Sequence, residues 1–196
     1  MSRKQEPDSV SRRTFIKTLS VGVAGTTIAG ALPPIAGAKD TPVPAGTRLL
    51  EFEVNGRSHR LHVEPRLTLA EVLRDRLDLT GTKVCCNQGT CGTCTVLLDD
   101  VAVYSCHMLA LDAAGHRVTT IEGLMEGEEL HALQKAFVER DGLQCGFCTP
   151  GQVMSAQALL LANPAPTTDE IREAMTGNLC RCGAYPKIIE SIEVAK

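Results

Sequence analysis

The sequence predicts an α+β fold, and three features of its patterning support that class. Near residue 50, hydrophobic and polar residues alternate on both sides of an Asn-Gly pair, which is typical of a β-hairpin. A capping box then precedes hydrophobic residues at helical spacing. The second half carries helical patterns only. We therefore expect an α+β domain over residues 48–124 and a helical domain over residues 125–196.

The first predicted element is the hairpin. Its strands carry hydrophobic residues at alternate positions, namely Leu50, Phe52, Val54, Leu61 and Val63. Asn55-Gly56 lies between them, and these residue types suit a two-residue turn because both positions need positive φ.

A helix is predicted next, since Thr68 and Glu71 form a capping box and Gly81 follows the expected end. One face of this helix would carry Leu69, Val72, Leu73 and Leu77. The stretch from Thr95 to Leu98 then predicts a strand.

Helices are predicted throughout the second half. On a first helix, one face would carry Leu130, Leu133, Ala136 and Phe137. A second would carry Val153, Met154, Ala158, Leu161 and Ala162, and would stop at Asn163-Pro164. Thr167 and Glu170 form another capping box for a helix through Ile171, Ala174 and Met175. The last helix would run from about Tyr185 to Val194.

The N-terminal region resembles a twin-arginine export signal. Ser11-Arg12-Arg13-Thr14-Phe15-Ile16-Lys17 resembles the motif, and weakly hydrophobic residues follow from Thr18 to Ile35. Ala36-Gly37-Ala38 fits the small-residue cleavage rule. We expect residues 1–38 to be a signal peptide, residues 39–47 to be a linker, and the protein to be exported folded to the periplasm.

An uncleaved signal that anchors the chain in a membrane is the alternative. Pro33-Pro34 interrupts the apolar stretch, which is barely long enough to span a bilayer. Cleavage after Ala38 is therefore the favoured interpretation.

Eight of the nine cysteines fall into two groups. The first group is Cys86, Cys91, Cys94 and Cys106. Its opening Cys-x4-Cys-x2-Cys run is the spacing of plant-type [2Fe–2S] ferredoxins. Small residues at Gly89 and Gly92 would let backbone N–H groups approach the sulfur atoms. Zinc sites usually pair two short Cys-x2–4-Cys runs, which this group fits poorly.

The second group pairs Cys145 and Cys148 with Cys180 and Cys182, after a gap of 31 residues. Taken alone, such pairs would also suit zinc or a redox dithiol. Beside the first group, we interpret them as a second [2Fe–2S] site. Pro150 suits a first helical turn and Gly177 a helix end, so both thiolate pairs would lie at helix termini.

Longer motifs surround both groups. They are Gly81-Thr82-Lys83, Cys91-Gly92-Thr93-Cys94-Thr95-Val96, Ser105-Cys106, Gln144-Cys145-Gly146-Phe147-Cys148-Thr149-Pro150-Gly151 and Gly177-Asn178-Leu179-Cys180-Arg181-Cys182. From about residue 48 onward, the chain resembles the small two-cluster [2Fe–2S] subunit of the xanthine oxidase family of molybdenum hydroxylases. The resemblance implies a β-grasp, plant-type ferredoxin-like domain followed by a small four-helix-bundle domain, with one cluster in each.

The resemblance also implies a function. Both clusters would relay electrons from a molybdopterin (molybdenum) cofactor in a separate large subunit to an FAD-binding subunit or a cytochrome. Gln144 and the loop around Cys182 would contact the pterin. Because substrate chemistry would lie in the large subunit, we expect no catalytic residue in this chain. The likeness is greatest to periplasmic aldehyde oxidoreductases, so we expect aldehyde oxidation to carboxylic acid. The alternative is an N-heterocycle hydroxylase of the isoquinoline or purine type.

Two positions depart from the family pattern. Cys85 stands where the family usually has glycine, and we interpret it as a bystander thiol, with an exchange of ligand roles with Cys86 as the alternative. Asp99-Asp100 stands where an Asp-Gly turn is usual, although glycine would tolerate positive φ better.

Composition limits the other functions. The chain has 20 basic and 23 acidic residues, and removal of residues 1–38 would leave a net charge of about −6, which gives no support for nucleic-acid binding. No glycine-rich nucleotide loop follows a strand, so a flavin would be held elsewhere. The five histidines are scattered and lack the paired Cys-His motifs of a Rieske site. The alternative function from a different class is a secreted binding module stabilised by zinc or by disulfides.

Overall fold

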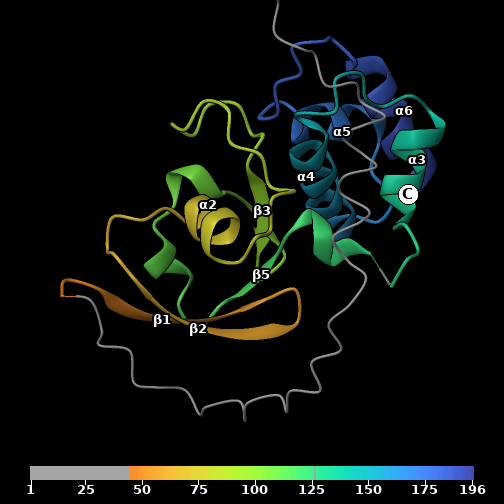
Figure 1. Cartoon of the computed structure of the whole chain (residues 1–196). Helices are drawn as coiled ribbons and strands as arrows, with labels where there is room; N and C mark the ends of the chain where they lie inside the picture. Colours follow the sequence, from red (N-terminus) through yellow and green to blue (C-terminus); the bar gives the residue numbers. More distant parts are fainter. Residues whose placement is uncertain (1–44, 126) are drawn as a thin grey trace, which may run out of the picture. The chain divides into compact units, whose positions relative to one another are not determined.

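The computed structural model describes residues 45–125 and 127–196, which belong to one compact unit (Figure 1). The predicted signal peptide, residues 1–38, and most of the predicted linker lie outside the described residues. The predicted α+β class is confirmed, because a mixed sheet forms first along the chain and helices follow it. The predicted domain boundary at residues 124 and 125 stays a prediction.

The sheet has five strands in the order β2-β1-β5-β3-β4. The strands are β1 (Arg48–Val54), β2 (Arg57–Val63), β3 (Thr95–Leu98), β4 (Val101–Tyr104) and β5 (Arg117–Thr119). Antiparallel pairs join β1 to β2, β3 to β4 and β3 to β5, whereas β1 and β5 run parallel. The central strand β5 therefore joins the two hairpins into one sheet.

Both hairpins turn through two residues with positive φ. Asn55 and Gly56 have φ of 50° and 75°, as the Asn-Gly signal predicts. Asp99 and Asp100 have φ of 47° and 70°, so the second turn has the same form without a glycine. Hydrogen bonds hold it: the Arg117 backbone N–H donates to Asp99 Oδ1 over 2.9 Å.

The predicted capping box at Thr68 is confirmed. The Glu71 N–H donates to Thr68 Oγ1 over 3.3 Å, and the Thr68 N–H donates to Glu71 Oε2 over 2.7 Å. The helix itself differs from a regular α-helix, because α2 (Leu69–Glu71) widens into a π-helix over Val72–Arg76. Hydrophobic spacing indicates which side chains face the core, and Val72 is indeed fully buried, but spacing does not specify the hydrogen-bond step.

Strand β3 is buried on both faces and separates two hydrophobic cores. Val96 packs into the core between the sheet and α2, together with Leu50, Leu69 and Val118. Leu97, the next residue, packs into the helical core. Successive side chains on a strand point to opposite faces, so this short strand connects the two halves.

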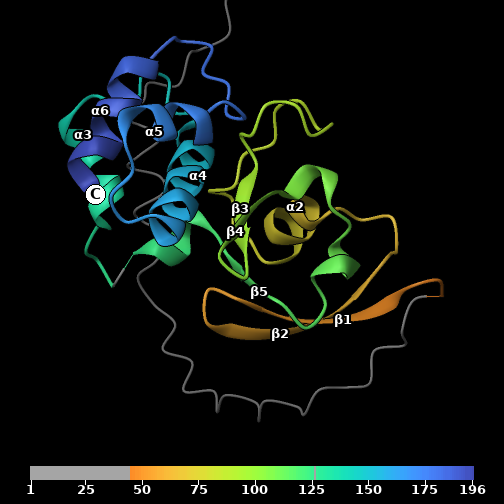
Figure 2. The same ribbon diagram turned by 180° about the vertical axis from the view of Figure 1, so that it is seen from behind.

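The helices are α3 (Ala132–Glu139), α4 (Thr149–Ala162), α5 (Thr168–Ala174) and α6 (Tyr185–Ala195). Single 3₁₀ turns lie at Ser105–His107, Ala110–Ala113 and Ile121–Leu124. Opposite views show α4 beside β3, with α3 and α6 farther from the sheet (Figures 1 and 2). The predicted capping box at Thr167 is confirmed, and α4 ends at Ala162, directly before the predicted stop at Asn163-Pro164.

Two helical predictions were wrong in detail. Leu130 was placed on the first helix, but it precedes α3 and is 42% exposed. Helix α5 ends at Ala174, three residues before Gly177, because the Thr176 N–H and hydroxyl both bond to the Glu173 carbonyl. Position 177 requires glycine for a reason other than helix termination, since a Cβ there would collide with the Tyr104 hydroxyl.

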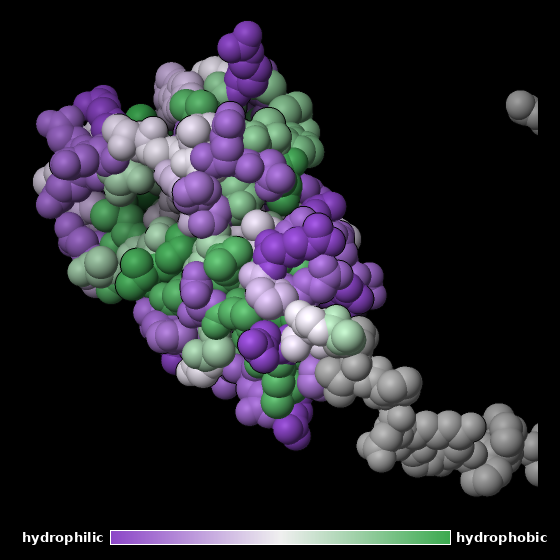
Figure 3. Space-filling view, turned by 90° about the vertical axis from the view of Figure 1, so that its left-hand side faces the viewer, coloured by the Kyte–Doolittle hydropathy of each residue, from purple (hydrophilic) through white to green (hydrophobic). Residues whose placement is uncertain are grey.

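The surface combines polar and apolar regions. Figure 3 shows a face on which hydrophobic residues form a band bordered by polar and charged residues. Large exposed apolar side chains beside the second cysteine group are Leu143, Phe147, Leu179 and Tyr185. None of the helices in the part of the chain that the structure describes is long and apolar enough to span a bilayer.

Candidate functional site

The first cysteine group lies on the loop before β3 and on the 3₁₀ turn after β4. Cys91, Cys94 and Cys106 are buried, and Cys86 is partly exposed. Their thiols approach one another in two pairs, Cys86 with Cys91 and Cys94 with Cys106. The group therefore presents its four sulfur atoms as two pairs.

Backbone N–H groups point at these sulfur atoms. The Thr90 N–H lies 3.4 Å from Cys86 Sγ, and the Cys106 N–H lies 3.4 Å from Cys94 Sγ. Gly89 and Gly92 have φ of 71° and 67°, which residues with a Cβ rarely adopt. The glycines predicted from the loop thus allow the turns that bring N–H donors to the thiols.

The thiols of this group differ in acidity. Hydrogen bonds from the Thr90 side chain, then from the Gln88 and Thr90 backbone, lower the pKa of Cys86 to about 5. Burial raises the pKa of Cys94 to about 12. A metal that binds the Cys94 thiolate must therefore displace its proton, which couples metal binding to proton release.

The second group has the same paired arrangement at the ends of two helices. Cys145 lies beside Cys182, and Cys148 lies beside Cys180. Cys148 is the residue before α4, and the N–H of Ala184, which precedes α6, lies 3.4 Å from Cys180 Sγ. The predicted placement at a helix terminus is therefore confirmed for Cys148, where the helix dipole favours negative charge. Cys180 does not follow the end of a helix directly as predicted, because α5 ends at Ala174.

Local contacts also adjust the acidity of this group. Burial, followed by the neighbouring Cys180, raises the pKa of Cys148 to about 11, while a hydrogen bond from the Gln152 side chain opposes the rise. The Phe147 backbone N–H, followed by the Cys182 side chain, lowers the pKa of Cys145.

The donor sets fit [2Fe–2S] clusters. Each iron of such a cluster takes two thiolates, and each group offers two thiol pairs and N–H donors for the sulfur atoms. Structural zinc sites also use cysteine thiolates. Among residues 45–125 and 127–196, no three or more His, Cys, Asp or Glu side chains lie close enough together to hold a single metal ion. All nine cysteines are free thiols.

A short segment before Cys180 connects the two groups. The Leu179 N–H donates to the Cys91 carbonyl over 2.9 Å, and Asn178 Nδ2 donates to the Gly92 carbonyl over 2.9 Å. One backbone hydrogen bond thus joins a first-group cysteine to the residue that precedes a second-group cysteine. The Tyr104 hydroxyl also donates to the Gly177 carbonyl over 3.0 Å.

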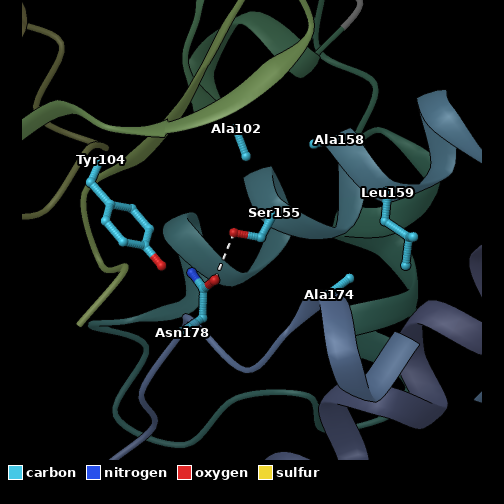
Figure 4. Close-up of a pocket in the computed structure, with 7 residues that line it drawn as sticks. All are labelled: Ala102, Tyr104, Ser155, Ala158, Leu159, Ala174 and Asn178. Atoms are coloured by element: carbon cyan, nitrogen blue, oxygen red, sulfur yellow. Dashed lines mark hydrogen bonds between the residues drawn. The ribbon is translucent and has the colours of Figure 1, made fainter. Parts of the chain in front are cut away.

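A cavity of about 350 Å³ lies beside this segment, between β4, α4 and α5. Figure 4 shows Ser155 and Asn178 pointing toward each other there, joined by a 2.8 Å hydrogen bond, with the Tyr104 side chain directed toward Asn178. The Gln152 Nε2 donates to the Asn178 carbonyl over 3.1 Å. Buried polar groups therefore fix the position of the segment.

The other predicted site residues lie at the surface. Gln144 is exposed next to Cys145, and its pterin contact stays a prediction. Cys182 is also exposed, which is compatible with a neighbour outside this chain. Cys85 is exposed beside the partly exposed Cys86, and its bystander role stays a prediction.

Reasoning from sequence alone missed the residues that support the ligands. Gln152 and Ser155 lie within the predicted second helix but have no predicted role, and Asn178 is named only as part of a motif. Tyr185 was expected only to begin the last helix, yet its hydroxyl accepts a hydrogen bond from the Cys180 N–H over 2.8 Å. The available signal was the presence of polar residues on otherwise apolar helix faces.

Comparison with known families divides the described chain into two. Residues 52–119 match the family described as "2Fe-2S iron-sulfur cluster binding domain". Residues 120–193 match the family described as "[2Fe-2S] binding domain".

Similar proteins are subunits of oxidoreductases. The chain is 40% identical to the aldehyde oxidoreductase iron–sulfur-binding subunit PaoA of Escherichia coli (strain K12), over 98% of this chain and 91% of that protein. It is 48% identical to the nicotine 6-hydroxylase small subunit of Paenarthrobacter nicotinovorans, over 78% of this chain and 92% of that protein.

Solved structures with the same fold include two enzymes. Quinoline 2-oxidoreductase from Pseudomonas putida 86 matches with a TM-score of 0.74 and 47% identity, over 77% of this chain and 95% of the matched chain. Aldehyde oxidoreductase from Desulfovibrio gigas matches with a TM-score of 0.73 and 41% identity, over 76% of this chain and 17% of the matched chain.

Proposed function

This chain belongs to the [2Fe–2S] subunits of the xanthine oxidase family of molybdenum hydroxylases, and from that membership we propose that it carries electrons from a molybdopterin-binding large subunit to a flavin subunit or a cytochrome. Each bound cluster would supply a one-electron redox centre. The observation that carries the proposal is the pair of four-thiol sites joined by the Leu179 to Cys91 hydrogen bond.

The residues of this chain would hold and connect the two centres. The first cluster would be held by Cys86, Cys91, Cys94 and Cys106, and the second by Cys145, Cys148, Cys180 and Cys182. Burial would shield the Cys91, Cys94 and Cys106 side of the first cluster from water. Its partly exposed edge at Cys86 would face the electron acceptor.

The second cluster would face the large subunit. Cys145 and Cys182 are exposed, and Phe147 and Leu179 beside them are 47% and 55% exposed. Exposed apolar side chains around a polar centre are typical of a surface that a partner covers. We place the pterin contact of the proposal at Gln144 and at the loop around Cys182.

Aldehyde oxidation to a carboxylic acid is the reaction we propose for the complex. The likeness to the aldehyde oxidoreductase subunit of Escherichia coli covers 98% of this chain, so it extends into the N-terminal region. An N-heterocycle hydroxylase is the second candidate. It is favoured by the higher identities, 48% and 47%, to the nicotine 6-hydroxylase subunit and quinoline 2-oxidoreductase.

Export to the periplasm by the twin-arginine route is also part of the proposal. Its support is the Arg12-Arg13 pair with the following weakly hydrophobic stretch. Replacement of both arginines by lysine should leave folded subunit in the cytoplasm, as measured by fractionation. Normal secretion of the double variant would refute the route.

Metal analysis tests the cluster assignment. Freshly isolated full chain should contain about four irons and about four labile sulfides, and should show two paramagnetic signals after reduction. Colourless protein that contains zinc or cystines would instead support the stapled binding module.

Purification of the native complex tests the rest. A molybdenum-containing partner should copurify with the chain, and the complex should oxidise aldehydes in preference to purines and other N-heterocycles. The reverse preference would support the second candidate, and the absence of a molybdenum partner would refute the relay.

A further inference from the structure

Residues 177–180, which we call the connecting segment, follow α5 and end at a thiol of the second cysteine group. The segment forms no helix or strand, and its Leu179 is 55% exposed. The cavity of about 350 Å³ lies beside it, and three small side chains line that cavity, namely Ala102, Ala158 and Ala174. Because packing restrains this side of the segment only weakly, hydrogen bonds have to hold it in place.

The connecting segment is bonded to both pieces of chain that supply the first cysteine group. Three of those cysteines lie on the loop before β3, and the Leu179 N–H donates to the Cys91 carbonyl of this loop over 2.9 Å. The fourth, Cys106, follows β4. Two residues before it, the Tyr104 hydroxyl donates to the Gly177 carbonyl over 3.0 Å. The segment is therefore attached to the first site at two separate points.

The Tyr104 side chain has a ring that packs and a hydroxyl that binds. The ring packs against the buried group of Ala70, Cys94 and Cys106, and a phenylalanine ring would pack in the same way. The hydroxyl is directed at the connecting segment, and a Cβ on Gly177 would collide with it (Figure 4). Only the hydroxyl, therefore, distinguishes tyrosine from phenylalanine at this position, and its partner is the second-site segment.

We propose that Tyr104 is a positioning residue that fixes the separation of the two clusters, because its hydroxyl anchors the connecting segment to the end of β4. This inference rests on the proposed function, in which one electron leaves the second cluster, which is oxidised, and enters the first, which is reduced. Such transfer slows steeply as the separation of the centres grows. Attachment at two points prevents the segment from pivoting about the Leu179 to Cys91 bond, so the separation stays constant.

The first test is paramagnetic resonance of the full chain, reduced with excess dithionite so that both clusters carry unpaired electrons. Each magnetic moment then splits the signal of the other cluster, by an amount that depends on their separation. We expect resolved splitting in the unaltered chain. In Tyr104→Phe the lines should broaden and the splitting should be lost, because the separation would take a range of values. The integrated signal of each cluster should stay the same.

Hydrogen exchange of the Leu179 amide is the second measurement. This N–H is protected by its bond to the Cys91 carbonyl, so it exchanges when the segment moves away from the loop. We expect exchange to be about tenfold faster in Tyr104→Phe, the change in equilibrium expected when a carbonyl loses its donor.

Ser191→Ala is the matched control. The Ser191 hydroxyl also donates to a backbone carbonyl, that of Lys187 over 2.7 Å, but this bond lies within α6. The control should leave both the splitting and the exchange of the Leu179 amide unchanged. Equal changes in Ser191→Ala and Tyr104→Phe would overturn the proposal, since they would indicate a general loss of stability.

Unchanged splitting, or unchanged exchange of the Leu179 amide, in Tyr104→Phe would also overturn the proposal. If that variant does not retain both clusters, the unaltered chain decides. Its Leu179 amide should then exchange no faster than the amides of β4, and faster exchange would overturn the proposal. An unaltered chain that holds fewer than two clusters would instead refute the proposed function.

Discussion

Gly92 lies where the two cysteine-bearing segments approach each other closely, so Gly92→Ala tests whether that contact is rigid. Gly92 has a φ of 67°, and a Cβ there would lie 2.8 Å from Asn178 Cγ and nearer still to the Gly177 carbonyl oxygen. The carbonyl belongs to the backbone and cannot rotate away. The loop or the segment at residues 177–180 would have to move.

Gly92→Ala is expected to lower the free energy of unfolding for two reasons. First, the left-handed backbone conformation destabilises a residue with a Cβ by about 1–2 kcal/mol. Separation of the segments would break the buried Asn178 to Gly92 hydrogen bond and leave both groups unpaired, at about 1–3 kcal/mol. We therefore expect Gly92→Ala to lower the free energy of unfolding by about 2–5 kcal/mol and to weaken retention of the first cluster.

The assay is loss of the first cluster's visible absorbance and paramagnetic signal in increasing urea. Gly115→Ala is the matched control, because Gly115 has a φ of 77° but nothing within 4 Å of the added Cβ. The control should show only the backbone cost of about 1–2 kcal/mol. Equal urea sensitivity of the two variants would refute a rigid contact at Gly92.

Three further predictions concern single residues. Cys182→Ser should remove the second cluster, so that the reduced chain shows one paramagnetic signal in place of two, and two unchanged signals would reject this ligand. Thr167→Ala removes the capping box of α5 and should cost about 1 kcal/mol in thermal or urea unfolding, whereas an unaltered midpoint would contradict the capping role. The His116 side chain, followed by the Arg117 backbone N–H, lowers the pKa of Asp99, so this carboxylate stabilises the fold above its unfolded pKa of about 3.9. That stabilisation should be lost as the pH falls through the lowered pKa, and Asp99→Asn should flatten the acid limb of a pH–stability curve; identical curves would exclude the interaction.

Local signals predicted most of the elements. The Asn55-Gly56 turn, the capping boxes at Thr68 and Thr167 and the stop at Asn163 depend on residues within a few positions of one another. Interactions between residues so close together in the sequence need no tertiary contact, so the sequence predicts them. The π-helix at Val72–Arg76 escaped prediction because the same hydrophobic face can be buried with either hydrogen-bond step.

The cysteine spacings in the sequence were enough to identify two four-thiol groups and the family that contains them. Ligand spacing is a property of a continuous stretch of chain, and it limits which metal can be held. Which thiol lies beside which, and how the groups are joined, was decided only by tertiary structure. Leu179 meets Cys91, and Gln152 meets Asn178, across gaps in the chain that no local rule bridges. Those contacts form because β3 buries both of its faces, which brings the helical half against the cluster loop.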